Sequence, residues 1–211
     1  MEIFEYCNKD SSVILVQPVD DHDMEGIENE IKAIRELSDT DFRLIAVKVD
    51  SWNRDLSPWP APAVFGNEDF GGCASAFLDE ILKLCPDDGK KNLLGGYSLA
   101  GLFALWAAYQ TDRFAGIAAA SPSVWFPGFV DLMRDNAVKS RAVYLSLGDK
   151  EETTRNPVMA TVGSCIREGY DILKSQNVRC TLAWNSGNHF KEADLRTARA
   201  FAWLMNEGLN K

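Results

Sequence analysis

The clearest structural pattern in the chain is the segment Asn92-Leu93-Leu94-Gly95-Gly96-Tyr97-Ser98-Leu99-Ala100-Gly101. An apolar run leads into Gly96-Tyr97-Ser98, and a second apolar run follows at once and extends to Tyr109. This order predicts a buried strand, a sharp turn with Ser98 at its tip, and a buried helix. Small neighbours let such a strained turn pass without clashes. The helix N-terminus would point backbone N–H groups at the space beside Ser98.

The turn is a variant of the nucleophile-elbow pattern G-x-S-x-G, because Ala100 replaces the last glycine and Gly101 follows it. Alanine is small enough to keep the packing. An ordinary glycine-rich βα turn of a doubly wound sheet is the competing interpretation. A nucleotide-binding turn is disfavoured, since the segment has neither G-x-G-x-x-G nor Gly-Lys-Ser/Thr.

Apolar runs and helical spacings alternate along the rest of the chain. Strands are expected at 13–17, 43–49, 92–95, 115–120, 142–147 and 180–184, with a weaker edge strand at 2–6. Helices are expected at 24–37, 77–84, 99–109, 158–173 and 195–204, the first of them capped by Asp23. This alternation predicts an α/β fold with a mostly parallel sheet, helices on both faces and a single domain over 1–211.

Composition narrows the function. The chain has 211 residues, 31 acidic against 22 basic, and a net charge of −9. Phosphate backbones and anionic membranes repel such a chain, so nucleic acid and membrane surfaces are not expected partners. No apolar run could cross a bilayer, and residues 1–6 lack a signal-peptide layout, which favours the cytoplasm. The five cysteines include no CxxC pair, and we expect buried, reduced thiols.

Histidine is scarce, since His22 and His189 are the only two in the chain. A serine nucleophile needs a base, usually a histidine held by a carboxylate. His189 lies in a loop after the strand at 180–184, before the last helix, and it follows Ser98 and an acidic loop in chain order. That loop, Gly148-Asp149-Lys150-Glu151-Glu152, offers three carboxylates. His22 lies among aspartates whose adjacent positions suit helix capping better than a metal site, so no metal is expected.

Three of these segments, 96–101, 120–125 and 187–189, resemble the α/β-hydrolase superfamily. Within it, the chain is similar to the serine esterases that include esterase D and the enterochelin-esterase and feruloyl-esterase domains. The resemblance implies a three-layer fold with little or no cap. It also implies hydrolysis of small carboxylic esters through an acyl-enzyme, without a cofactor, with Ser98 as nucleophile and His189 as base.

The family's spacing favours Glu151 as the acid, with Asp149 as the alternative and Glu152 third. The resemblance further implies an oxyanion hole made by the amide of Leu99 and by one near the end of the strand at 13–17. We expect that second amide at Val19, or at Asp20.

Substrate contacts are expected from Trp59, Trp125 and Tyr97, because their loops follow strands at the carboxyl edge of the sheet. A thioesterase, peptidase or acyltransferase built on the same residues, or a non-catalytic binding protein, remains the alternative to an esterase. The acyl group, the alcohol group and the oligomeric state stay open.

Overall fold

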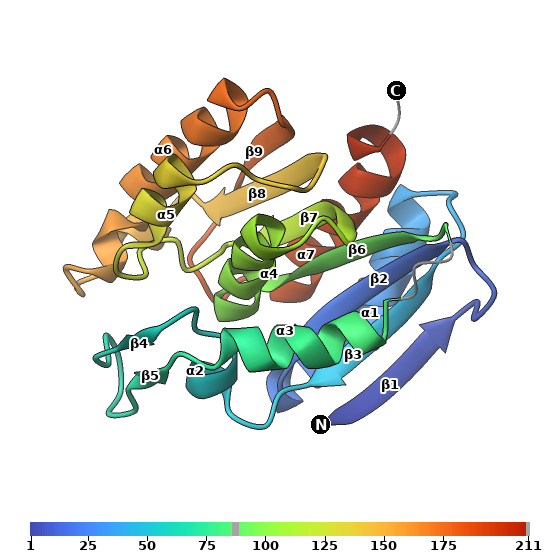
Figure 1. Ribbon diagram of the computed structural model, residues 1–211, viewed down its shortest axis with the longest axis horizontal. Helices are drawn as coiled ribbons and strands as arrows, with labels where there is room; N and C mark the ends of the chain where they lie inside the picture. Colours follow the sequence, from blue (N-terminus) through green and yellow to red (C-terminus); the bar gives the residue numbers. More distant parts are fainter. Residues whose placement is uncertain (86–88, 210–211) are drawn as a thin grey trace.

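A seven-stranded sheet runs through the centre of the computed structural model, which describes residues 1–85 and 89–209 (Figure 1). Its strand order is β1-β3-β2-β6-β7-β8-β9. Every neighbouring pair is parallel except β1 with β3, so β1 is an antiparallel edge strand. The strands are β1 (Glu2–Cys7), β2 (Val13–Val19), β3 (Arg43–Lys48), β6 (Lys91–Tyr97), β7 (Phe114–Ala120), β8 (Ala142–Gly148) and β9 (Arg179–Asn185).

Helices cover both faces of this sheet (Figure 1). The apolar sides of α1 (Asp21–Leu37) and α7 (Ala193–Trp203) pack against one face, together with the π-helical turn η3 (Leu204–Gly208). The other face carries α3 (Ala74–Lys83), α4 (Leu99–Gln110), α5 (Phe129–Asp135) and α6 (Val162–Ser175). The predicted α/β class and its mostly parallel sheet are therefore confirmed.

Short elements complete the chain and were not predicted. They are α2 (Trp52–Asp55), the two-stranded β4 (Pro60–Ala61) and β5 (Phe70–Gly71), and the 3-10 turns η1 (Glu151–Thr153) and η2 (Met159–Thr161). The helix α5 was also missed, because it spans only seven residues after a left-handed glycine, Gly128. The predicted helix at 158–173 begins later, at Val162, because η2 precedes it.

The first turn of α1 differs from the prediction in one detail. Asp20, not Asp23, is the N-cap residue, and its side chain accepts a 2.8 Å hydrogen bond from the Asp23 backbone N–H. The Asp23 carboxylate returns the contact by accepting from the Asp20 N–H at 3.2 Å. The two aspartates thus form a reciprocal capping box, which accounts for part of the acidic cluster around His22.

Close packing of α4 and α7 against the sheet depends on two glycines at the end of β6. A Cβ atom on Gly95 would lie 2.6 Å from the Cβ of Ala118 on β7 and 2.6 Å from the Phe201 ring on α7. A Cβ on Gly96 would lie 2.6 Å from the Cβ of Ala100 in the first turn of α4. The apolar α4, buried from Leu99 to Tyr109, can therefore begin directly against the end of β6.

All five cysteines are free thiols, as expected, but Cys85 alone among them is fully buried and the other four are partly exposed. Within residues 1–85 and 89–209, the longest apolar helices fall short of what a bilayer span requires.

Candidate active site

Ser98 lies at the tip of the turn between β6 and α4, at the carboxyl edge of the sheet. Its φ of +57° is in the left-handed region, which is strained for a residue with a side chain. The Ser98 N–H donates to the carbonyl of Ala120 at 3.1 Å, which ties the turn to the neighbouring strand β7. The backbone therefore holds the hydroxyl out at the edge of the sheet, as the sequence pattern predicts for a nucleophile elbow.

The structure brings Ser98, His189 and Glu151 into one hydrogen-bonded chain. The Nε2 atom of His189 lies 3.0 Å from the Ser98 Oγ, and its Nδ1 atom lies 2.7 Å from Glu151 Oε2. Glu151 begins the turn η1 after β8, and His189 lies in the loop between β9 and α7. Because β8 and β9 are parallel neighbours with Gly148 opposite Asn185, the loops that follow them lie side by side.

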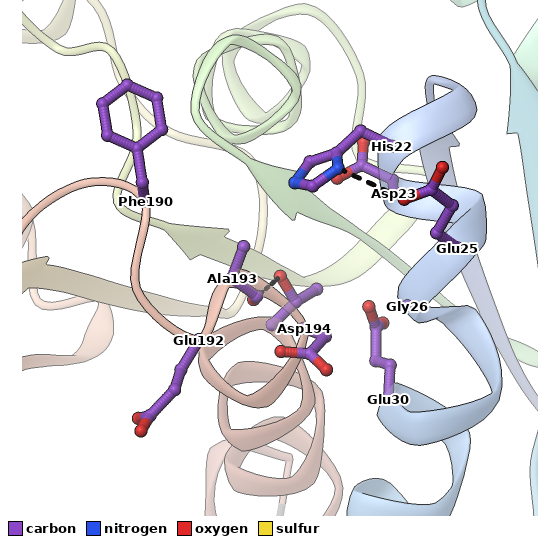
Figure 2. A pocket seen from close by; sticks show the side chains of 10 residues that line it. His22, Asp23, Glu25, Gly26, Glu30, Phe190, Glu192, Ala193 and Asp194 are labelled. Atoms are coloured by element: carbon purple, nitrogen blue, oxygen red, sulfur yellow. Dashed lines mark hydrogen bonds and ion pairs between the residues drawn. The ribbon is translucent and has the colours of Figure 1, made fainter.

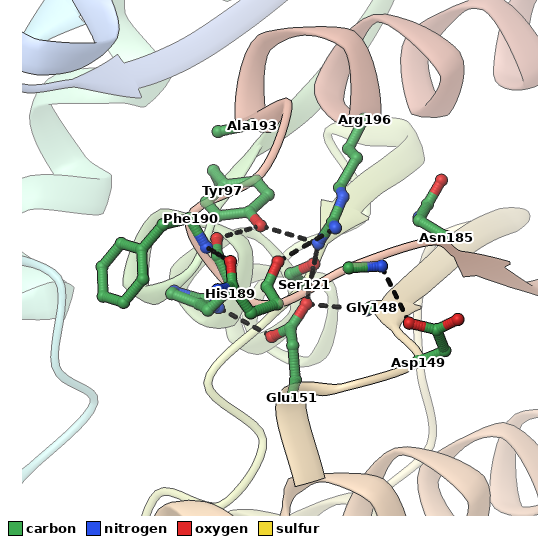
Figure 3. Close-up of polar contacts among 12 residues, drawn as sticks. Tyr97, Ser121, Gly148, Asp149, Glu151, Asn185, His189, Phe190, Ala193 and Arg196 are labelled. Carbon is green, nitrogen blue, oxygen red and sulfur yellow. Dashed lines mark hydrogen bonds and ion pairs between the residues drawn. The ribbon is translucent and has the colours of Figure 1, made fainter. Parts of the chain in front are cut away.

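The second oxygen of Glu151 is held as firmly as the first (Figure 3). Oε1 accepts hydrogen bonds from the Gly148 N–H at 2.7 Å, the Ser121 hydroxyl at 2.8 Å and the Arg196 guanidinium at 2.8 Å. Burial raises the pKa of Glu151, but hydrogen bonds from His189, Gly148 and Ser121 and the attraction of His189 outweigh it, so the pKa lies below its usual value. Glu151 is therefore an ionised carboxylate in a fixed orientation.

Arg196 is the residue of this network that the sequence did not single out. It projects from α7 and is fully buried. Besides Glu151, its guanidinium donates to the Tyr97 hydroxyl at 3.0 Å and to the Ser121 hydroxyl at 3.2 Å. It also donates to the backbone carbonyls of Ser186 and Asn188, at 3.3 and 3.0 Å. A signal was present, because Arg196 shares one helical face with the buried Ala200 and Leu204, where a charged residue is unexpected.

The other two carboxylates of the acidic loop make different contacts. Asp149 Oδ1 accepts from the Gly187 N–H at 2.8 Å and so ties the acidic loop to the loop that carries His189 (Figure 3). Glu152 turns outward and pairs with Arg167 of α6 through hydrogen bonds of 3.0 and 3.1 Å. Of the three candidates, Glu151 is the one in contact with the imidazole.

Tyr97 contacts both the backbone and the ring of His189. Its hydroxyl donates to the His189 backbone carbonyl at 2.6 Å, and the two rings lie 5.1 Å apart between centroids. Burial raises the pKa of Tyr97 to about 12, so the hydroxyl keeps its proton at neutral pH. Tyr97 was predicted to touch substrate, which stays a prediction; in the structure its hydroxyl contacts the His189 loop and Arg196.

A cavity of about 670 Å³ opens beside Ser98 and His189. Its wall is largely apolar and includes Trp52, Phe65, Trp125, Met159, Val162 and Phe190. Trp125 was expected here, whereas Trp52 and Phe65 were not. The other predicted tryptophan, Trp59, packs against Phe126 with ring centroids 5.5 Å apart and donates through Nε1 to the Pro127 carbonyl at 3.0 Å. Ser123 also borders the cavity, with its hydroxyl 3.4 Å from the Ser98 hydroxyl.

The chain matches known proteins in structure and not in sequence. No protein-family model matches the chain, and no curated protein matches it in sequence. An IroE-like serine hydrolase from Shewanella oneidensis superimposes with a TM-score of 0.76 at 16% identity, covering 96% of this chain and 75% of that one. The siderophore hydrolase EstA from Aspergillus nidulans gives 0.64 at 19% identity, over 92% of this chain and 82% of that one. A carboxylesterase from Bacillus cereus gives 0.61 at 17% identity, over 96% and 93%.

The chain has the α/β-hydrolase fold. In an α/β-hydrolase, the amide after the nucleophile and an amide from the loop of an earlier strand face the developing oxyanion. Leu99 directly follows Ser98 and begins α4, so its amide belongs to the free N-terminal end of that helix. Val19 ends β2, the strand beside β6. The register pairs Val16 with Leu94, so three residues further along each strand Val19 is level with Tyr97, the residue before Ser98. The alternative donor, the Asp20 amide, is already bonded to Asp23.

His22 lies outside this candidate site. It is exposed on the first turn of α1, where its Nδ1 atom is 3.7 Å from Glu25 Oε2. Over the described part of the chain, no three His, Cys, Asp or Glu side chains are grouped so as to hold a metal ion.

Proposed function

We propose that this protein is a serine esterase that hydrolyses small carboxylic esters through an acyl-enzyme at Ser98. The observation that carries this proposal is the continuous hydrogen-bonded chain from Ser98 through His189 to Glu151, beside an apolar cavity. That arrangement supplies a nucleophile, a base and a carboxylate that orients the base, which together are the requirements of a catalytic triad.

In the proposed reaction, Ser98 Oγ attacks the ester carbonyl while His189 Nε2 takes the hydroxyl proton across the 3.0 Å contact. Glu151 accepts the hydrogen bond from Nδ1, which fixes the tautomer and stabilises the imidazolium that forms. Amides at Leu99 and Val19 are our candidates for holding the oxyanion. His189 then protonates the leaving alcohol, and a water molecule activated by the same imidazole releases the acid.

The cavity wall suggests the class of ester. Aromatic and aliphatic side chains, among them Trp52, Phe65 and Trp125, favour a substrate with an apolar group next to the scissile bond. Structural neighbours include a siderophore hydrolase and a carboxylesterase, which agrees with an ester as substrate. We therefore expect small esters with an apolar acyl or alcohol portion to be the best substrates.

A panel of p-nitrophenyl esters of increasing acyl length tests the proposal, with a fluorophosphonate probe as a second readout. Ser98→Ala should lower kcat by several orders of magnitude and abolish labelling. Ser164→Ala, an exposed serine on α6, is the matched control and should behave like the wild type. Full activity in Ser98→Ala, or a folded wild-type protein that neither hydrolyses these esters nor labels, would contradict an esterase and favour a non-catalytic binding protein.

A further inference from the structure

A second cavity, of about 300 Å³, lies between the N-terminal ends of α1 and α7 (Figure 2). The two helices can approach here because Gly26 has no side chain, and a Cβ on it would lie 3.3 Å from the Cβ of Asp194. Carboxylates from both helices line the space: Asp23, Glu25, Glu30, Glu192 and Asp194. We refer to this space as the acidic cleft.

Glu30 forms the floor of the acidic cleft and is incompletely bonded. It is only 3% exposed. Its Oε2 atom accepts from the Gln17 side chain at 3.2 Å, whereas Oε1 is buried without a hydrogen-bond partner among the described residues. Figure 2 shows its carboxylate directed into the space beside Asp194. A buried carboxylate oxygen without a donor is costly, so this atom marks a position where a ligand could supply the missing contact.

The charges that act on Glu30 are negative. Burial is the main effect that raises its pKa well above the usual value, and the negative charges of Asp23 and Asp194 raise it further. Burial and the charge of Asp20 likewise raise the pKa of Asp23 to about 6. Two of the five cleft carboxylates have a basic neighbour: Glu25 lies 3.7 Å from the His22 ring, and Glu192 lies 3.8 Å from Lys191 and 3.9 Å from Arg199. A positive ligand would relieve this repulsion.

Phe190 connects the acidic cleft with the proposed active site. It follows His189 directly, their ring centroids lie 5.6 Å apart, and it lines both the acidic cleft and the cavity beside Ser98. The side chain is 89% exposed, which is unusual for a large apolar group. Phe190 and the carboxylates line one space, and an aromatic ring combined with carboxylates recognises organic cations, through cation–π attraction and charge.

We propose that the acidic cleft binds an organic ammonium group. If the proposed esterase function holds, on which this step rests, the cleft selects esters that carry a positive charge away from the scissile bond. The aromatic ring of Phe190 and the apolar Ala193 in the lining suit a bulky alkylammonium better than a hydrated metal ion. Glu30 supplies the buried oxygen without a partner, and Asp194 is the second carboxylate beside it.

A pair of isosteric esters tests the selectivity. Acetylcholine and 3,3-dimethylbutyl acetate have nearly the same shape and differ in one positive charge. Wild-type protein should favour acetylcholine in kcat/KM by about tenfold, the effect of one well-placed aromatic and ionic contact. Glu30→Gln can still accept from Gln17, and it should bring the ratio close to one, as should Asp194→Asn. Glu28→Gln removes the same charge from an exposed position on α1 and should leave the ratio unchanged.

Binding is measured separately from hydrolysis, so that the two proposals can fail independently. Tetramethylammonium chloride, titrated into Ser98→Ala protein at constant ionic strength, should shift the backbone NMR signals of Gly26, Phe190 and Asp194, and Glu30→Gln should suppress the shifts. If the protein hydrolyses neither these esters nor the p-nitrophenyl panel, the esterase proposal fails and this titration still decides the cleft. No saturable shift, equal shifts in Glu30→Gln, a wild-type ratio near one, or displacement by calcium chloride at low concentration would overturn the ammonium site.

Discussion

Replacing Arg196 with methionine should change both the stability of the protein and the pH dependence of its proposed hydrolysis. Methionine keeps the apolar stem of the side chain but removes a fully buried positive charge. Glu151 would then retain its contacts with Gly148, Ser121 and His189 but lose the 2.8 Å ion pair. Removing one partner of a buried pair leaves the other charge uncompensated, which typically costs about 3–5 kcal/mol of unfolding free energy.

The electrostatic effect on catalysis can be estimated from the same geometry. Arg196 and His189 contact opposite oxygens of Glu151, at 2.8 and 2.7 Å. Two such bonds and the carboxylate between them separate the guanidinium and the imidazole by roughly 6–7 Å. At an effective dielectric constant of about 20–40, Coulomb's law then gives about 1–3 kcal/mol of repulsion between the guanidinium and a protonated imidazole. Removing the guanidinium favours the imidazolium, so the acid limb of the kcat/KM profile should move upward by about one to two pH units.

The assay is kcat/KM for a p-nitrophenyl ester across the acidic and neutral pH range, with unfolding free energies from urea titrations. Arg196→Lys keeps the charge and should leave the acid limb in place even if the rate falls. Arg199→Met changes a partly exposed arginine of the same helix that has no contact with Glu151, and it should leave the acid limb in place. If Arg196→Met folds poorly, the double variant Arg196→Met/Glu151→Gln, which buries no unpaired charge, should regain stability. A lower rate with an unmoved acid limb would refute the electrostatic argument and leave Arg196 with a packing role.

Three further outcomes are expected. Glu151→Gln should lower kcat/KM by up to about 10⁴-fold, because an amide cannot hold the imidazole in the same tautomer with the same charge, whereas Asp149→Asn, which can still accept from the Gly187 N–H, should retain most activity. Gly95→Ala should lower the unfolding free energy by about 1–3 kcal/mol in urea titrations, since its Cβ has no space between β7 and α7. Asp23 keeps its proton up to pH about 6 when folded, but only to its ordinary value near 3.8 when unfolded. Wild-type stability should therefore fall relative to Asp23→Asn as pH rises from about 4 to about 7, by on the order of 2–3 kcal/mol, and a pH-independent difference would contradict this.

Much of the fold was predictable because its signals are local. Six apolar runs and the weak run at 2–6 became the seven strands of the sheet, and the five helical spacings became α1, α3, α4, α6 and α7. Glycines and the apolar run after Ser98 were sufficient to predict the strained turn. Short elements such as α5 and the β4–β5 pair could not be predicted, since too few residues repeat for a period to appear.

The candidate site was likewise predictable in part. The order Ser98, acidic loop, His189 is visible in the chain, and parallel strands bring such loops to one edge of a sheet. Choosing among Asp149, Glu151 and Glu152 requires knowing the direction in which each side chain leaves the loop. Three acidic residues within four positions of the sequence do not reveal these directions. Glu151 contacts His189 because η1 turns its side chain inward. The other two carboxylates bond elsewhere, Asp149 to the Gly187 N–H and Glu152 to Arg167.

Sequence alone therefore determined the elements, their class and the chemical types at the carboxyl edge of the sheet, because each depends on residues within one or two helical turns. Tertiary structure alone decided the contacts between distant segments. Arg196 reaches the acid loop because α7 packs across the sheet, and Glu30 lies near Asp194 because α1 meets α7 at Gly26. Such contacts depend on packing geometry between parts of the chain far apart in sequence, which no local period encodes.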